Sequence, residues 1–182
     1  MSTQTYTQSY TPEEEIVTPV EAGVHAPTTP QAERADQPST AAIGKHPLHP
    51  LAVTVPIGLL VGTTASDIAG LMSGDRFWAR ASRTLLGGAL ISGATAALLG
   101  ATDFFTIRKA RGPMGIAHAG GNATILALSA ASFLIRGGYR ARIPRRAALL
   151  SGIAGTMLMV TGWLGGEMSY RQGIGVVPPE ER

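Results

Sequence analysis

The chain has 182 residues, no cysteine, 45% apolar residues and only 15% charged residues, well below the roughly 25% that is usual in soluble domains. The absence of cysteine excludes disulfides, thiolate metal ligands and cysteine nucleophiles. A net charge of +3 on an apolar chain with few aromatic residues is typical of a membrane protein rather than a nucleic-acid binder. The sequence shows neither a phosphate-binding loop nor a nucleophile–base pair, so nothing in it supports an enzyme.

Residues 1–44 are predicted to form a disordered polar and acidic tail. They are rich in Thr, Pro, Gln and Glu, and they carry six acidic residues against a single base. Such a segment cannot bury enough apolar surface to offset the entropy that folding removes. It does not resemble a signal peptide, because it lacks both a basic start and an apolar stretch of about 7–15 residues.

The remainder of the chain, residues 45–177, is predicted to be one domain of four transmembrane helices, followed by a short tail at 178–182. Four apolar runs place these helices at about residues 50–72, 80–104, 114–136 and 145–168. Each run is close to the ~20 residues that a helix needs to cross the bilayer. Buried helices of a soluble bundle would show polar outer faces with a period of 3.6 residues, which these runs lack. The predicted fold is therefore an all-α, integral membrane four-helix bundle.

Small residues recur at four-residue spacing within these helices and predict close packing between helices. The stripe in the first helix consists of Gly58, Gly62, Ser66 and Gly70, and the one in the fourth consists of Gly162 and Gly166. Helix association in a bilayer relies on such close approach, because no hydrophobic effect drives it there. Pro56 predicts a kink in the first helix, which membrane helices tolerate.

Four crossings put both chain ends and the second loop on one side of the membrane, and the first and third loops on the other. The second side carries eight arginines: Arg76, Arg80, Arg83, Arg136, Arg140, Arg142, Arg145 and Arg146. The first side carries five bases near the helices: Lys45, Arg108, Lys109, Arg111 and Arg171. The positive-inside rule then predicts that the termini are extracytoplasmic. Asp67 lies toward the arginine-rich side, where Arg76, Arg80 or Arg83 could pair with it.

Most other polar residues of the helices fall on the side that carries the termini. These residues are His46, His49, Asp103, His118, Asn122, Glu167 and Arg171. Neutral imidazole is a common metal ligand, and helix bundles build metal sites from side chains on facing helices. The first and third helices of an up-and-down bundle are diagonal, so His49 and His118 could approach each other at similar depth. One interpretation of this pattern is a haem or transition-metal site with His46, His49 and His118 as ligands, and Asp103 or Glu167 as acceptors that orient the rings.

Two other interpretations stay open. In the first, HPLHP only caps the first helix, since Pro50 suits a first helical turn and Glu167 with Arg171 forms an ordinary i, i+4 pair. The protein would then be a structural or partner-binding membrane protein without a cofactor. The second is a small transporter or proton conductor, which is less favoured because the middle of the membrane lacks charged residues and broken helices.

The chain also shows a faint repeat. One half runs from His49 through a helix, a basic loop and a helix rich in small residues to Asp103, and the other runs likewise from His118 to Glu167. Two such hairpins, related by an axis along the membrane normal, would gather both histidines and both acids around that axis.

Several motifs together resemble domain-of-unknown-function family 2231, which comprises small bacterial four-helix membrane proteins. They are HPLHP followed by PIGLL, the loop GDRFWARAS, HAGGN, and the closing GWLGGEMSYRQGIGV, and they span about residues 44–177. Some members are joined to Rieske-type iron–sulfur domains. The resemblance thus implies a redox-associated subunit of the bacterial inner membrane, with the bilayer, a membrane redox protein or a second copy as partner. Members often carry further histidines where this chain has Thr54 and Gln172, so any ligand role at those positions would be missing here.

Overall fold

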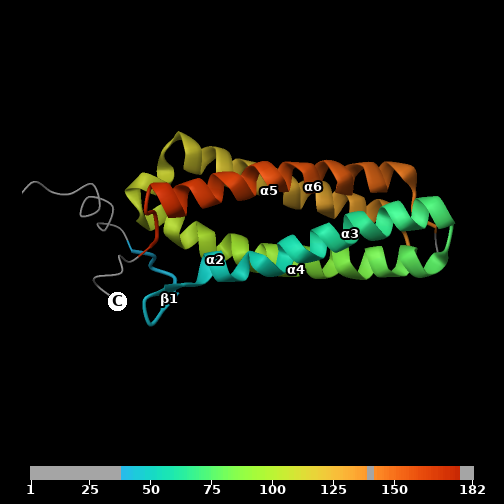
Figure 1. Cartoon of the computed structure of the whole chain (residues 1–182), viewed down its shortest axis with the longest axis horizontal. Helices are drawn as coiled ribbons and strands as arrows, with labels where there is room; N and C mark the ends of the chain where they lie inside the picture. The colour runs from blue at the N-terminus through green and yellow to red at the C-terminus, as the bar shows by residue number, and fades with distance from the viewer. Residues whose placement is uncertain (1–37, 139–141, 177–182) are drawn as a thin grey trace, which may run out of the picture.

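The computed structural model describes residues 38–138 and 142–176, which form a bundle of four long antiparallel helices (Figure 1). In chain order the elements are β1 (Ala42–Ile43), β2 (His46–Pro47), α2 (Leu48–Ala52), α3 (Thr54–Ser73), α4 (Arg76–Thr106), the 3-10 turn η1 (Arg108–Arg111), α5 (Pro113–Ile135), α6 (Arg145–Gly166) and the π-helical turn η2 (Glu167–Arg171). The predicted all-α four-helix fold is confirmed. The two short strands form only a small antiparallel hairpin before the first helix.

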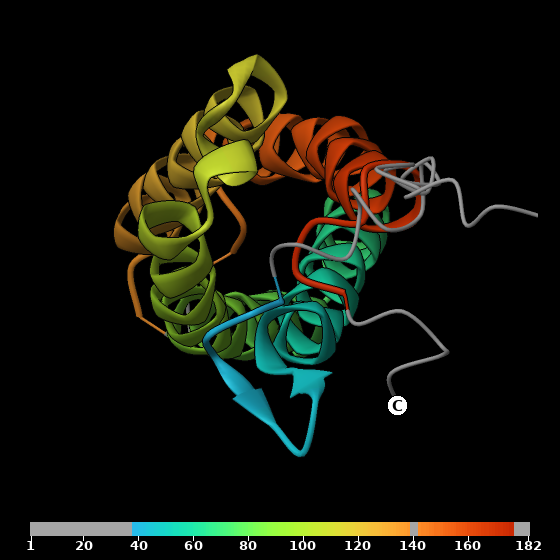
Figure 2. The same cartoon turned by 90° about the vertical axis from the view of Figure 1, so that its left-hand side faces the viewer.

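The four helices form a closed ring when the bundle is viewed along its axis (Figure 2). Helix α3 packs mainly on α4, and α5 mainly on α6, so the bundle consists of two helical hairpins. The contacts of α3 with α6 and of α4 with α5 join these hairpins, which leaves α3 and α5 diagonal to each other. This is the arrangement that brings the beginnings of α2 and α5 to the same end of the bundle.

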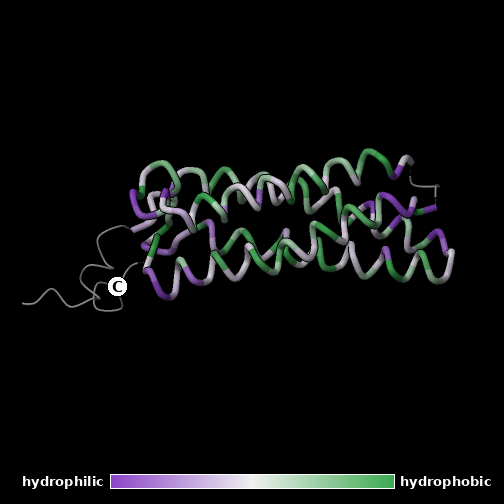
Figure 3. The backbone as a smooth tube through the Cα atoms, turned by 90° about the horizontal axis from the view of Figure 1, so that it is seen from above, coloured by the Kyte–Doolittle hydropathy of each residue, from purple (hydrophilic) through white to green (hydrophobic). Residues whose placement is uncertain are grey.

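Apolar residues predominate along the middle of the helices, whereas hydrophilic residues gather at the two ends of the bundle (Figure 3). Ile91, Leu98, Leu134 and Met159 are each at least 72% exposed. In water so many exposed large apolar side chains would be unfavourable, but in a bilayer they face hydrocarbon. The spans Leu48–Ser73, Arg76–Thr106, Pro113–Ile135 and Arg145–Arg171 are all long and apolar enough to cross the membrane.

The interior of the bundle is apolar in the middle and polar toward both ends. A buried cluster of Leu60, Leu86, Ala89, Ile125 and Ala154 fills the middle. Buried hydroxyl and charged side chains lie on the arginine-rich side of this cluster, and two histidines lie on the other.

The first membrane span is interrupted at Val53, between α2 and α3. Pro56 has no N–H to donate to the carbonyl four residues earlier, that of Ala52, and its ring crowds that carbonyl. The hydroxyl of Thr54 donates to the carbonyl of Leu51 over 2.8 Å, which supplies a hydrogen bond beside the interruption. The backbone at Val53 stays in the helical region, with φ of -66° and ψ of -19°, so α2 and α3 together form one span.

Only part of the predicted glycine stripes lies at contacts between helices. A Cβ on Gly62 would lie 3.3 Å from Leu85, and one on Gly70 would lie 2.6 Å from Ile143. Ser66 is buried, and a Cβ on Gly166 would meet only Tyr170 at 3.8 Å. A Cβ on Gly58 or Gly162 would meet nothing within 4 Å, and both residues are exposed, so neither makes a close contact within the described part of the bundle.

The segment just before the first helix is folded against the end of the bundle. Pro38 pairs with Gly175, and Ser39 and Thr40 bind the carboxylate of Asp103. Residues 38–44, which fall within the segment predicted as a tail, are therefore placed against the bundle, with Ser39 and Thr40 bound to Asp103. The rest of the predicted N-terminal tail, residues 1–37, and the predicted C-terminal tail, residues 178–182, lie outside the described residues.

Candidate functional site

His49 is fixed by a hydrogen bond to the backbone of the neighbouring helix. Its Nδ1 lies 2.8 Å from the carbonyl oxygen of Ala96 in α4. A carbonyl can only accept, so Nδ1 carries the proton and donates it, which leaves Nε2 as the free nitrogen of the neutral ring. Gly100, one turn further along α4, allows the ring to approach, because a Cβ there would lie within 2.8 Å of it.

His118 repeats this arrangement in the second hairpin. Its Nδ1 lies 2.9 Å from the carbonyl oxygen of Thr161 in α6, and Gly165, one turn further along, leaves room for its ring. Asn122 lies one turn after His118, where its amide donates to the His118 carbonyl over 2.8 Å and lies 3.4 Å from the ring nitrogen Nε2. Both histidines are thus held in the same tautomer by backbone carbonyls.

The two imidazole rings meet across the bundle. Their centroids are 6.3 Å apart and their planes are nearly perpendicular, at 89°. Side chains this close could each contribute a ring nitrogen to one metal, since a metal–imidazole bond is about 2.0–2.1 Å long. Of the three predicted histidine ligands, the structure therefore brings His49 and His118 together.

The other residues predicted to join this site are engaged elsewhere. His46 lies exposed on β2, before the first helix. Asp103 accepts hydrogen bonds from Ser39 and Thr40, and Glu167 pairs with Arg171 over 2.8 Å. Among the described residues, no group of three or more His, Asp or Glu side chains is placed to hold a metal. The ring-orienting acceptors are backbone carbonyls rather than the predicted carboxylates, because the chain segment before the helix takes Asp103.

A buried ion pair lies in the bundle interior toward the opposite end. Asp67 of α3 and Arg136, the residue that ends α5, are 3% and 4% exposed and share two hydrogen bonds of 2.6 Å. Three serines surround the pair, and two of them also hydrogen-bond to the carboxylate: Ser82, Ser132 and Ser151. Each of the four long helices therefore contributes to one polar cluster.

The partner of Asp67 is not one of the arginines expected from the sequence. Arg76 and Arg80 are exposed, while Arg83 donates to the carbonyl of Phe133 and stacks on that ring at 4.1 Å. Asp67 faces the bundle interior, where only a residue on another inward face can reach it. Arg136, one of the eight arginines counted on the arginine-rich side, occupies that position.

The positions of both clusters support the repeat hypothesis. His49 and His118, Asp67 and Arg136, and Ser82 and Ser151 are each separated by 69 residues. Equivalent residues of the two hairpins therefore meet at both clusters, as a two-fold axis along the bundle requires. The expected gathering of Asp103 and Glu167 around that axis does not occur, since each has another partner. The regular spacing of 69 was visible in the sequence and could have indicated the Asp67–Arg136 pair.

The comparisons with known proteins give one match. A family model described as "Predicted membrane protein (DUF2231)" matches residues 45–178, which is most of the chain. No curated protein and no solved structure matches it. The matched region begins just before HPLHP and includes both polar clusters.

Proposed function

The chain belongs to the DUF2231 family of predicted membrane proteins, and we propose that it is a small multi-pass membrane subunit whose His49 and His118 ligate one metal, as haem iron or as a bare transition-metal ion. The observation that carries the proposal is the paired imidazoles, 6.3 Å apart and both bonded through Nδ1 to a carbonyl. This is how metal-ligating histidines are usually held. Bound iron would supply one-electron redox chemistry.

The charge of the donor set favours haem over a bare ion. Two neutral imidazoles would leave a divalent cation largely uncompensated in apolar surroundings, which is unfavourable. Among the described residues no carboxylate joins the pair, since Asp103 and Glu167 are bound elsewhere. Haem would bring ring nitrogens and negative charge of its own, so His49 and His118 would suffice as the residues that hold it.

The metal proposal is tested by an absorption spectrum and metal analysis of the full chain, purified in detergent and supplied with haem. We expect a Soret band that His49→Ala and His118→Ala each abolish, because each removes a residue that would hold the iron. His46→Ala is the matched control and should keep the band, since His46 is exposed on β2. Folding of each variant is checked by its far-ultraviolet circular dichroism.

The outcomes separate the alternatives. A stoichiometric ion without a Soret band, lost in the same two variants, would assign a bare metal. If the protein retains neither haem nor metal, the histidines act only as clamps between helices, and the structural or partner-binding alternative replaces the proposal. The structural or partner-binding role is the second candidate function. It is supported by the hydrogen bonds from the His49 and His118 rings to backbone carbonyls, because each of these bonds joins two helices.

We also infer that the His49–His118 end of the bundle is extracytoplasmic in the bacterial inner membrane. Arg136 pairs with Asp67 and Arg171 pairs with Glu167, which leaves seven of the eight arginines at the opposite end against four of the five bases at this one. Arg140 is counted from the sequence alone, because it lies outside the described residues. The positive-inside rule favours the arginine-rich end as the cytoplasmic one.

Reporter fusions test this orientation. Alkaline phosphatase, which is active only outside the cytoplasm, is expected to be active when fused after Arg182 and inactive when fused after Gly138, between α5 and α6. Green fluorescent protein at the same two sites is the control and should give the opposite pattern. Phosphatase activity after Gly138 alone would show that the chain is inserted the other way round.

A further inference from the structure

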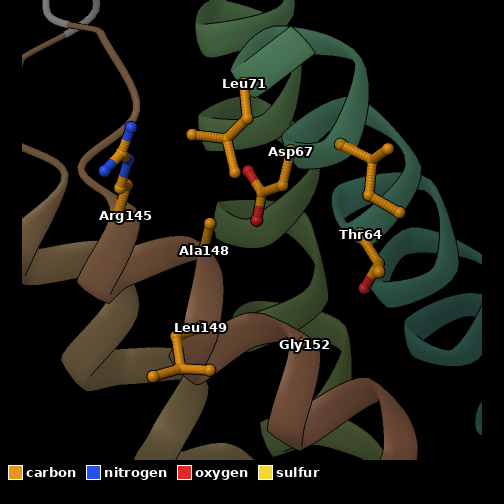
Figure 4. Close-up of a pocket in the computed structure, with 8 residues that line it drawn as sticks. Thr64, Asp67, Leu71, Arg145, Ala148, Leu149 and Gly152 are labelled. Carbon is orange, nitrogen blue, oxygen red and sulfur yellow. The ribbon is translucent and has the colours of Figure 1, made fainter.

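A groove opens on the side of the bundle between α3 and α6 (Figure 4). It has a volume of about 350 Å³. Small residues create it, because Ala148 and Gly152 lie one turn apart on α6 and leave space opposite α3. A Cβ on Gly152 would meet nothing within 4 Å. The groove lies within two membrane spans, so the medium next to it is lipid.

The rim of the groove is apolar. Ile68 and Leu71 of α3 and Leu149 of α6 line it, and each is at least 46% exposed. These side chains face the surroundings of the bundle rather than its core. An acyl chain is the apolar occupant that the bilayer itself provides at high concentration, and the groove would give it contacts on two sides.

The end of the groove is positively charged. Arg145, the first residue of α6, lines the groove and is exposed, and the exposed Arg142 and Arg146 lie beside it in the chain. Asp67 also borders the groove, but Arg136 and two serines engage both of its oxygens. The carboxylate is therefore compensated, and the net charge offered to an occupant is positive.

We propose that this groove binds an anionic phospholipid, with one acyl chain against Ile68, Leu71 and Leu149 and the phosphate at Arg145. The apolar lining of the groove matches the acyl chain of such a lipid, and the arginine at the end of the groove matches its anionic headgroup. Basic pockets between transmembrane helices bind anionic headgroups by this combination. The proposal is independent of the metal site, which lies toward the other end of the bundle.

The test is native mass spectrometry of the full chain in detergent, titrated with phosphatidylglycerol or phosphatidylcholine of the same acyl chains. Phosphatidylglycerol should bind more tightly, and Arg145→Gln should weaken it by about fivefold, the effect of one nearby cation. Arg76→Gln is the matched control, because Arg76 is an exposed arginine at the same end but outside the groove. Its effect should be less than twofold.

A second variant tests the groove itself. Gly152→Leu fills the space and should reduce phosphatidylglycerol binding without unfolding the protein, because a Cβ at this position meets nothing within 4 Å and the rest of the side chain can enter the open groove. Gly58→Leu, an equally open glycine elsewhere on the outer surface, should leave binding unchanged. Equal effects of Arg145→Gln and Arg76→Gln, or of the two leucine variants, would show nonspecific attraction of lipid and overturn the proposal.

Discussion

Replacing Arg136 with Met is expected to lower the free energy of unfolding by about 3–5 kcal/mol, because the Asp67 carboxylate would stay buried without its partner. Both carboxylate oxygens of Asp67 accept hydrogen bonds from the Arg136 guanidinium, and Asp67 is only 3% exposed. Serine hydroxyls from α4 and α6 remain near the carboxylate but cannot neutralise its charge. Within a bilayer, little water can replace the lost partner.

Removal of both charges separates the cost of an unpaired charge from the value of the pair. The double variant Asp67→Leu with Arg136→Met should have a free energy of unfolding within about 1 kcal/mol of that of the unaltered chain. A buried ion pair and apolar side chains of similar size often contribute nearly equally to stability. The reversed pair, Asp67→Arg with Arg136→Asp, should recover most of the loss, because the two positions are equivalent in the two hairpins.

Unfolding by SDS in mild detergent, followed by circular dichroism, measures these differences. Arg76→Met is the matched control, because it removes an exposed arginine from the same end of the bundle. Equal stability of Arg136→Met and Arg76→Met would contradict the buried ion pair. Failure of the reversed pair alone would contradict only the equivalence of the hairpins.

Gly115→Ala is expected to lower the free energy of unfolding by about 3 kcal/mol or more, because it overpacks the turn between α4 and α5. A Cβ at this buried position would lie 1.7 Å from the carbonyl oxygen of Ala110 in η1. The clash is with backbone, so no side-chain rotation can relieve it, and η1 would have to move away from α5. That movement would also disturb Ala110 and its buried neighbours Ile107 and Ile174.

Gly120→Ala provides the control within the same helix. A Cβ there would meet nothing within 4 Å, so the helix should be unchanged or stabilised by about 0.5–1 kcal/mol. The same unfolding measurement applies to both variants. Equal stabilities would show that η1 yields easily and that Gly115 is not required for the turn.

The membrane spans could be predicted from the sequence because they depend on local properties. Length and continuous hydropathy decide whether a segment crosses a bilayer, and neither requires knowledge of a neighbour. The largest error in a helix start is at α4, which begins at Arg76 rather than residue 80. Asp75 caps it by accepting from the N–H of Phe77 over 2.8 Å, and this helix-start signal was visible in the sequence.

The order of the helices in the ring also followed from the chain, because short connections join neighbours. That order sufficed to predict the approach of His49 and His118 from diagonal helices, which the structure shows. It did not indicate that His46 lies outside the bundle. Nor did it reveal the carbonyls of Ala96 and Thr161 as the groups that orient the rings, since every residue of a helix carries the same backbone group.

The sequence by itself thus determined that this chain forms four membrane-spanning helices with polar residues near both ends. Only the tertiary structure decided which of those residues face inward and meet. In a soluble bundle the apolar face would mark the inward side, but in a bilayer the lipid-facing surface is as apolar as the core. Asp67 therefore had several arginines within apparent reach, and the rotation of α3 and α5 about their axes selected Arg136.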